Sequence, residues 1–385
     1  MDSIPYGRQL IDDDDIGAVV EILKSDWLTQ GPTIEKFERA VANYCGVEYA
    51  VAVNSATSAL HIACLASGLG PGDVLWTSPN TFVASANCGL YCGASVDFVD
   101  IDPNTYNLSV DALRERLEGA GNKLPKVVIP VHFSGQSCQM DEIYDLSKKY
   151  GFSVIEDASH AIGGRYKDEP IGNCRFSDMT IFSFHPVKII TSGEGGMIMT
   201  NRRDLYEKLI LLRSHGITRN PALMTEFSQG PWYYQQIDLG YNYRITDIQA
   251  ALGVSQMNKI DSFVQRRHEI AERYNQELQV FPLILPLQHP DTYSAYHLYV
   301  IRLKLTELTL THRDIYIKLR EKGIGVNLHY IPVHTQPYFQ KLGFKLGQYP
   351  QAEQYYEEAI SIPIYYSLTN KQQAYVIRTL NEVIA

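Results

Sequence analysis

The strongest constraint on the fold of this chain is a regular alternation of short apolar runs with helix-like segments over residues 50–200. The runs are rich in Val, Ile and Phe, and their length is that of buried strands. Helix-like segments such as 58–66, 110–117 and 140–150 separate them. This alternation predicts an α/β fold with a mostly parallel sheet between helices. The predicted strands are residues 50–53, 74–76, 96–99, 127–131, 152–155, 180–184 and 197–199.

Longer helices dominate the sequence after residue 201. Thr246 and Gln249 have the spacing of a capping box, and the apolar stripe behind them continues to Tyr274, which predicts one very long helix. We expect a large domain over residues 1–250 and a smaller α+β C-terminal domain over residues 251–385. The elements predicted for the smaller domain are strands at 297–305 and 325–331 and helices near 313–321 and 371–383.

The N-terminal segment is acidic and lacks the charged-then-apolar layout of a signal peptide. Four consecutive aspartates, residues 12–15, precede an apolar stripe of Ile16, Val19, Val20 and Leu23. This spacing predicts an amphipathic helix whose acidic residues lie at the positive end of the helix dipole.

Charge and cysteine content restrict the partners and the compartment. Thirty-four basic against 43 acidic residues give a formal net charge of −9, which argues against nucleic acid and against an anionic membrane surface. The six cysteines form no CxxC pair, and no His cluster has zinc spacing, so no metal site is expected. Because no apolar run is long enough to span a bilayer, we expect a cytoplasmic protein.

Ligands of open α/β sheets bind beyond the carboxyl ends of the strands, where this chain places several polar segments. One of them, residues 54–58, passes from a predicted strand into a helix through small hydroxyl residues. Free backbone N–H groups there, with the hydroxyls of Thr57 and Ser58, can hold a phosphate. Ordinary helix capping by Ser55 or Thr57 is the alternative, which the sequence leaves open.

Asp157 follows the predicted strand 152–155, among apolar neighbours. A carboxylate in that setting needs a cationic partner to stay ionised, and a protonated heterocyclic nitrogen would supply one. An aspartate that caps the next turn is the open alternative.

Lys188 is the sharpest signal, because long apolar side chains flank it on both sides in the segment 181–190. Lysine normally avoids such places. A desolvated lysine can lose its proton at neutral pH and attack a carbonyl to form a Schiff base. The alternative is a lysine at a strand end that keeps its ammonium group in water.

Together these segments offer a phosphate seat, an acid for a ring nitrogen, an aromatic face at Phe82 and an apolar lysine. Each feature is ambiguous alone, but the set matches the needs of pyridoxal phosphate. The segment 193–196 lacks GxGxxG spacing and precedes a strand, so it is not a dinucleotide fingerprint. No GxGxxG follows the first predicted strand, which disfavours a nicotinamide-dependent oxidoreductase.

Six motifs resemble the DegT/DnrJ/EryC1/StrS family of nucleotide-sugar aminotransferases, and the resemblance runs over essentially the whole chain. It implies a type I aminotransferase fold and a homodimer with active sites at the interface. Two further segments, 213–216 and 329–334, are similar to the subgroup of pseudaminic acid biosynthesis. The six motifs are Leu28-Thr29-Gln30-Gly31, Asn54-Ser55-Ala56-Thr57-Ser58-Ala59-Leu60, Glu156-Asp157-Ala158-Ser159-His160-Ala161, Ser183-Phe184-His185-Pro186-Val187-Lys188, Gly193-Glu194-Gly195-Gly196 and Gly240-Tyr241-Asn242-Tyr243-Arg244.

The resemblance also implies roles by motif position. Lys188 should form the covalent link to the cofactor, Asp157 should face the pyridine nitrogen, and Phe82 should stack on the ring. His160 occupies a position where several relatives carry Gln, near the phenolic oxygen of the cofactor. The residues implied to hold the cofactor phosphate are Thr57, Ser58 and Ser183, with Asn242 reaching in from the partner subunit.

The implied reaction moves an amino group from L-glutamate to the C4 keto group of a UDP-linked 4-keto-6-deoxy-N-acetylhexosamine, with Lys188 shuttling the proton. Roles as turn residues or as a packed strand end remain open for the four main sugar-site candidates. Arg244 and Arg219 are open candidates for the donor carboxylate. The sugar-site candidates are Thr29, Gln30, His329 and Tyr330, followed by the weaker Glu194 and His215.

Three alternatives to this interpretation remain. Another UDP- or dTDP-4-keto sugar could be the substrate. A pyridoxal-phosphate sensor could bind the cofactor without turnover. Some relatives are dehydratases with His at the lysine position, and Lys188 favours transamination over that chemistry.

Overall fold

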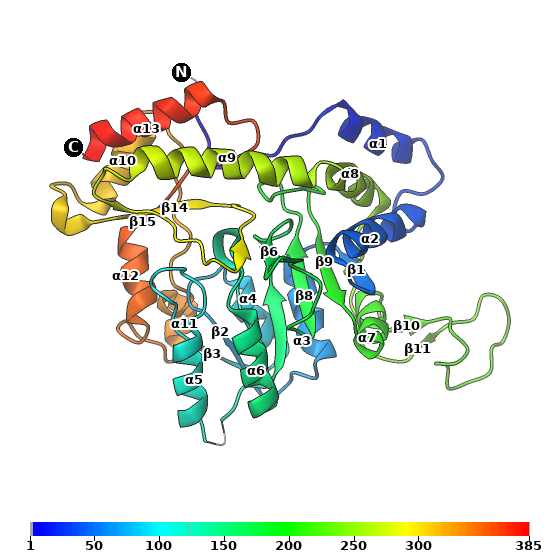
Figure 1. Ribbon diagram of the computed structural model, residues 1–385. Helices are drawn as coiled ribbons and strands as arrows, with labels where there is room; N and C mark the ends of the chain where they lie inside the picture. The colour runs from blue at the N-terminus through cyan, green and yellow to red at the C-terminus, as the bar shows by residue number, and fades with distance from the viewer. Residues whose placement is uncertain (1–2, 122, 385) are drawn as a thin grey trace.

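The computed structural model describes residues 3–121 and 123–384, and a seven-stranded sheet forms its centre (Figure 1). The strand order is β1-β9-β8-β5-β4-β2-β3. β9 runs antiparallel to both of its neighbours, and the other pairs are parallel. All seven predicted strands are confirmed, as β1 (Tyr49–Val53), β2 (Val74–Thr77), β3 (Ser95–Phe98), β4 (Val127–Ile129), β5 (Ser153–Asp157), β8 (Met179–Ser183) and β9 (Gly196–Thr200).

Helices cover both faces of this sheet, because each strand alternates its side chains between them. Val51 and Val53 of β1 pack in one buried cluster, whereas Ala50 and Ala52 pack in another on the opposite face. The first face is covered by α3 (Ala56–Ala66), α4 (Ala84–Tyr91) and α7 (Arg203–Arg213), and the second by α2 (Pro32–Cys45), α5 (Val110–Gly119) and α6 (Met140–Tyr150).

A second, three-stranded antiparallel sheet has the order β12-β14-β15 and lies in the C-terminal part of the chain. The predicted strand 297–305 is confirmed as β14, and the predicted helices near 313–321 and 371–383 are confirmed as α10 and α13. The proposed domain division at residue 250 stays a prediction. The elements of this part are β12 (Leu283–Ile284), β14 (Tyr299–Leu303), β15 (Ala359–Ile362), α10 (His312–Glu321), α11 (Pro337–Lys341), α12 (Pro350–Glu358) and α13 (Asn370–Ile384).

The predicted strand 325–331 is wrong. Only Asn327 pairs like a strand residue there, in an isolated bridge with Ser361. Beyond it the chain leaves the sheet, and the N–H of Val333 bonds to the carbonyl of Pro79 at 2.9 Å. Val326 packs in a buried cluster with Ile301 and Ile362 of the small sheet, whereas Ile331 is 46% exposed, and alternation alone does not distinguish such a loop from a strand.

The predicted very long helix is also wrong, because it is broken into α8 (Asp247–Met257) and α9 (Ile260–Leu278). The capping box is confirmed: Thr246 accepts from Gln249 N–H, and the Gln249 side chain accepts in return. At the break, the N–H groups of Asn258 and Lys259 bond only three residues back, which closes α8 with a tight turn. The apolar stripe stays in phase across the break, so the sequence did not reveal it.

The predicted N-terminal helix is confirmed as α1 (Asp13–Leu23), with a capping box between Asp12 and Asp15. Its apolar stripe does not face the core: Ile16 is 53% exposed and Leu23 55% exposed. Asp15 is buried instead, where it accepts from Ser255 at 2.6 Å and Gln256 at 2.7 Å of α8. The helix thus packs on α8 through polar contacts and leaves an apolar stripe uncovered.

A hairpin arm extends away from the body of the molecule between β10 (Ile217–Thr218) and β11 (Gln235–Gln236) (Figure 1). Large apolar side chains of the arm are exposed, among them Phe227 at 96% and Trp232 at 71%. The remaining short strands are β6 (Arg165–Tyr166), β7 (Glu169–Pro170) and β13 (Thr292–Tyr293), which form a small sheet of their own. No helix of the described residues is long and apolar enough to cross a membrane.

Candidate active site

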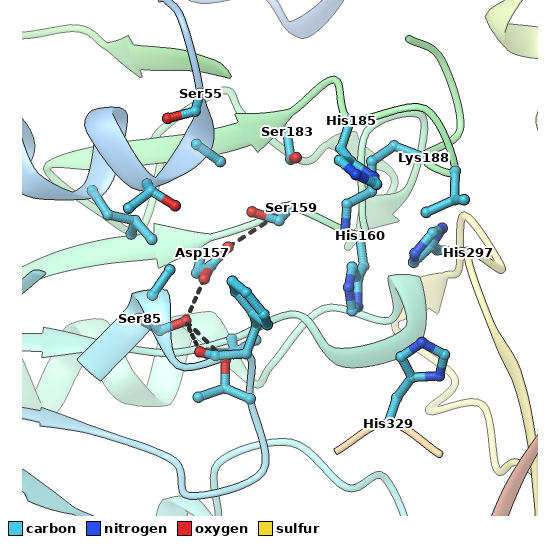
Figure 2. A pocket seen from close by; sticks show the side chains of 18 of the residues that line it. Ser55, Ser85, Asp157, Ser159, His160, Ser183, His185, Lys188, His297 and His329 are labelled. Atoms are coloured by element: carbon cyan, nitrogen blue, oxygen red, sulfur yellow. Dashed lines mark hydrogen bonds between the residues drawn. The ribbon is translucent and has the colours of Figure 1, made fainter. Parts of the chain in front are cut away.

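A cavity of about 880 Å³ lies at the carboxyl ends of β1, β5 and β8, as the rule for open α/β sheets predicts. Asn54, Asp157 and Ser183, at or just beyond the ends of those strands, line it. The segment 327–330, from the C-terminal part, closes another side. Figure 2 shows the side chains from these elements converging on one space.

The start of α3, where the sequence predicts a phosphate seat, lines the cavity. Ser55 caps the helix, since its hydroxyl accepts from the N–H of Ser58 at 3.1 Å, and the hydroxyl of Ser58 donates to Asn54 at 2.7 Å. Helix capping by Ser55 therefore occurs. It satisfies only one of the free backbone N–H groups at the start of the helix, and the other N–H groups remain available at the cavity. Gly196 allows this close packing, because a Cβ there would lie 2.5 Å from the backbone of Ser55.

Asp157 is 5% exposed and ends β5 with its carboxylate at the cavity. It accepts from the Ser85 hydroxyl at 2.6 Å and from the Ser159 N–H at 3.1 Å (Figure 2). Ser85 in turn pairs with Thr81 at 2.8 Å. Among the residues that the structure describes, none forms an ion pair with Asp157, so the carboxylate lacks the cation that a buried acid needs.

Lys188 lies in the turn that follows β8, and its backbone N–H donates to the carbonyl of His185 at 2.9 Å. Burial lowers the pKa of its amine to about 8, and the nearby Asp157 carboxylate offsets part of that shift. A lysine at its ordinary pKa is almost entirely ammonium at neutral pH, whereas this one keeps a reactive free-amine fraction.

Three buried histidines, His160, His297 and His329, line the cavity with Lys188, and the exposed His185 lies next to the lysine (Figure 2). Burial, followed by the positive charge of Lys188 or a neighbouring histidine, lowers the pKa of each of the three buried histidines, for His329 to about 3. These three are neutral at physiological pH. His160 and His297 pack with ring centroids 4.4 Å apart, and the buried Nδ1 of His297 has no hydrogen-bond partner among the described residues.

The structure brings most of the predicted site residues together. Phe82 is 59% exposed and lies along the cavity wall. Glu194 lies on the loop before β9, and Tyr330 enters from the C-terminal part. Their roles toward a ligand stay predictions. The predicted residues that line the cavity are Thr57, Ser58, Phe82, Asp157, His160, Ser183, Lys188, Glu194, His329 and Tyr330.

Four predicted residues lie outside this cavity: Thr29, Gln30, His215 and Asn242. They gather near the segment 240–245. Gln30 donates to the carbonyl of Ile245 at 3.2 Å, the N–H of His215 bonds to Tyr241 at 2.9 Å, and Asn242 bridges to Ser214. Asn242 is expected to act from a partner subunit, so a position outside its own cavity agrees with that prediction without testing it.

Several residues that line the cavity were not predicted from the sequence. Ser85 lies in the first turn of α4, shortly after the predicted Phe82, and its nearness in sequence to that residue could have indicated it. His185 lies in a segment already singled out at a strand end. Tyr6, Gln249, His297 and Asn327 gave no signal, because tertiary packing alone places them at the cavity.

The chemistry of these residues fits pyridoxal phosphate. A helix start with hydroxyls suits the phosphate, and the unpaired carboxylate of Asp157 suits a protonated ring nitrogen. Phe82 offers an uncovered aromatic face, and Lys188 offers an amine for the aldehyde.

The comparison with known proteins assigns the chain to a family. The model of the DegT/DnrJ/EryC1/StrS aminotransferase family matches residues 9–381. The chain belongs to this family. The predicted resemblance is confirmed, and the protein is an aminotransferase, an enzyme class whose chemistry runs on pyridoxal phosphate.

Relatives and solved structures are similar to this aminotransferase over nearly its whole length. The spore coat polysaccharide biosynthesis protein SpsC of Bacillus subtilis is 40% identical, covering 99% of this chain and 97% of its own. A UDP-4-amino-4,6-dideoxy-N-acetyl-beta-L-altrosamine transaminase of Campylobacter jejuni is 38% identical with the same coverage. Helicobacter pylori PseC, an aminotransferase of pseudaminic acid biosynthesis, superposes with a TM-score of 0.90 at 31% identity, covering 99% of both chains. The predicted type I aminotransferase fold is thereby confirmed.

Proposed function

We propose that this aminotransferase transfers an amino group from L-glutamate to the C4 keto group of a UDP-linked 4-keto-6-deoxy-N-acetylhexosamine, in pseudaminic acid biosynthesis. The observation that carries the proposal is the 38% identity, over 99% of the chain, to a transaminase named for the matching 4-amino-4,6-dideoxy sugar. The structural likeness to PseC also supports it.

The residues of this chain divide the binding work. The start of α3, with Thr57, Ser58 and Ser183, holds the cofactor phosphate without any global positive charge. Asp157, kept in place by Ser85, pairs with the protonated pyridine nitrogen. Phe82 covers one face of the ring. Pyridoxal phosphate, when bound, supplies the electron sink for amino-group exchange.

Lys188 carries both the covalent attachment and the proton. Its lowered pKa leaves part of the amine unprotonated at neutral pH, which suits nucleophilic attack on an aldehyde. Once substrate has displaced it, the same amine takes a proton from one carbon and returns it to another, as a general base and then a general acid. The neutral histidines around it add no competing positive charge.

The proposed enzyme is a homodimer with shared active sites, because the cavity of one chain carries too little positive charge for a nucleotide sugar. Lys188 is the sole Lys or Arg among the described lining residues, yet a nucleotide sugar adds a diphosphate to the cofactor phosphate. Asn242 and Arg244 lie outside their own cavity, where a second copy could receive them. The uncovered apolar stripe of α1 offers surface for such self-association.

The test is a product assay in two stages. Purified protein with pyridoxal phosphate is mixed with L-glutamate alone, and the visible band of the cofactor should give way to that of its amine form. A panel of UDP- and dTDP-4-keto sugars is then added, and mass spectrometry with NMR identifies any amino sugar. Failure of the first stage contradicts the glutamate donor, and amination of only other sugars contradicts the substrate.

A different nucleotide sugar is the second candidate, favoured by the 40% identity to SpsC, whose name places that relative in spore coat polysaccharide biosynthesis. The same panel decides between the two. A higher kcat/KM with a sugar that lacks the N-acetyl group or carries dTDP supports this candidate.

A further inference from the structure

Both ring nitrogens of His160 are already occupied within the protein. The backbone N–H of Ser134 donates to Nδ1 at 3.3 Å, and Nε2 lies 3.1 Å from the hydroxyl of Tyr330. A backbone N–H can only donate, so Nδ1 must be the unprotonated nitrogen. Because the ring is neutral, its single proton lies on Nε2, and His160 donates to the oxygen of Tyr330.

The donor on Ser134 is held firmly. Ser134 has a φ of +64°, a conformation that a non-glycine residue adopts only when its surroundings fix it. Its hydroxyl donates to the carbonyl of Leu298 at 2.7 Å, and its carbonyl accepts from the N–H of the same residue at 3.3 Å. The ring of His297, packed against His160, fixes the imidazole from another side.

Tyr330 consequently has one hydrogen-bonding capacity left. Its oxygen accepts from His160, so its own O–H proton is free to donate, and the residue lines the cavity. No other side-chain hydrogen bond of this hydroxyl occurs among the described residues. Such a donor with no acceptor points to a ligand.

The position of Tyr330 indicates which part of the ligand it meets. Its ring lies 6.2 Å from the rings of Phe82 and Phe133, on the side where the cofactor ring is expected. Tyr330 lines the same cavity as Asp157, and burial together with that carboxylate raises the pKa of the tyrosine, so its hydroxyl stays protonated. In pyridoxal the phenolic oxygen sits on the ring edge between the nitrogen and the aldehyde carbon, and hence between the partners Asp157 and Lys188.

We propose that Tyr330 donates a hydrogen bond to the phenolic oxygen of pyridoxal phosphate, and that His160 is a positioning residue that aims this hydroxyl from the fixed N–H of Ser134. The proposal rests on the proposed function only in taking pyridoxal phosphate as the cofactor. It moves Tyr330 from the sugar side of the site to the cofactor side.

The first test uses the protein without cofactor. Nitrogen-15 NMR of labelled protein at pH 7.5, with His160→Gln to assign the signals, should show His160 as the neutral tautomer protonated on Nε2. A proton on Nδ1 would overturn the proposal. Neither glutamate nor a sugar takes part, so failure of the proposed function leaves this result intact.

The second test adds pyridoxal phosphate alone to Tyr330→Phe. The affinity for the cofactor should fall about 10-fold, the size of one lost hydrogen bond to a charged oxygen. The midpoint pH of the visible band should rise by about one unit, because the donor stabilises the phenolate. His160→Leu should likewise lower the cofactor affinity and raise the midpoint pH. His160→Gln should change these two quantities less, since an amide can accept from the N–H of Ser134 and donate to the hydroxyl of Tyr330.

The matched control is Tyr375→Phe, which removes a hydroxyl that bonds to the carbonyl of Lys322 on the surface at 2.9 Å. Thermal unfolding confirms that each variant is folded. If Tyr330→Phe has the same cofactor affinity and the same midpoint pH of the visible band as this control, the proposal is overturned. A change confined to the KM for the sugar also overturns it, because the hydroxyl would then serve the sugar.

Discussion

The two ends of the cavity are built in different ways. At the cofactor end, the predicted residues of this chain line the cavity and are held by neighbours, as Ser58 is by Asn54 and Asp157 by Ser85. At the expected sugar end, Glu194 and His329 line the cavity, but Thr29, Gln30 and His215 lie outside it. The first set lies at strand ends of one sheet, whereas Thr29 and Gln30 lie on the loop between α1 and α2 and His215 follows α7 near the hairpin arm.

Under the proposed function, this difference predicts that one copy supplies most of the cofactor site and that a second copy contributes to the sugar site. Strand ends of a parallel sheet meet at one edge, so a chain with this pattern assembles most of the cofactor end from its own residues, and only Asn242 is expected there from a partner subunit. The diphosphate of a nucleotide sugar requires positive charge that the lining of one chain does not supply. Under the proposed homodimer, that charge comes from the loops of a second copy.

The largest effect should come from Lys188→Ala at the cofactor end. Loss of the nucleophile and of the proton carrier together should lower kcat for amino transfer by about 10⁴-fold or more. Borohydride should no longer fix the cofactor to the protein. Lys208→Ala, which removes a lysine near the carbonyl of Ala66, is the matched control. A reducible adduct in Lys188→Ala would show that another lysine holds the cofactor.

The double variant Asn242→Ala/Arg244→Ala tests whether the active site needs a second copy. Two lost bonds to anionic groups, one of them the bond of Asn242 to the cofactor phosphate, should lower kcat/KM by roughly 10²-fold or more and weaken cofactor binding. Mixing this variant with Lys188→Ala should restore about a quarter of the activity, because half of randomly re-formed dimers contain one intact site. No recovery in re-formed, mixed dimers would place both sets of residues in the same subunit's site.

Asp157→Asn probes the charge balance inside the cofactor end. Removing the charge that pairs with the ring nitrogen should weaken cofactor binding by roughly 10- to 100-fold. The capture rate of pyridoxal phosphate should rise with pH through about 8, because the free amine of Lys188 attacks. Asp157 stabilises the ammonium form, so this midpoint should move to lower pH in the variant. Stopped-flow absorbance measures the midpoint, and an upward shift would contradict the assignment.

The smallest effect should come from Gln30→Ala at the sugar end. Gln30 lies outside the cavity and donates to the carbonyl of Ile245, so cofactor affinity should remain unchanged. The KM for the nucleotide sugar should rise by about 2- to 10-fold, the size of one neutral hydrogen bond. Titration of the cofactor and steady-state kinetics separate the two quantities. Weaker cofactor binding by Gln30→Ala would show that Gln30 also serves the cofactor end, which contradicts the division of the cavity into two ends.

Much of the fold was predictable because periodicity reports burial directly. The seven strands of the large sheet follow from their Val- and Ile-rich runs. The errors came where an apolar pattern fits two structures. Residues 325–331 form a loop with one isolated bridge, and the stripe from Ile248 to Tyr274 continues through a break between two helices. The stripe of α1 gave the correct helix, but the buried contacts with α8 come from Asp15.

The sequence was sufficient for the strands, their polar carboxyl ends and the amine of Lys188, because these depend on local pattern and on chain order. It could not place His297, or show that Tyr330 contacts His160, that Ser85 holds Asp157 and that Ser134 fixes His160. Those contacts join residues between 26 and 170 positions apart, counting the bond from His160 to Tyr330. Hydrogen bonds of this kind depend on angles and tautomers that arise only when separate elements pack against one another, so they belong to the tertiary structure.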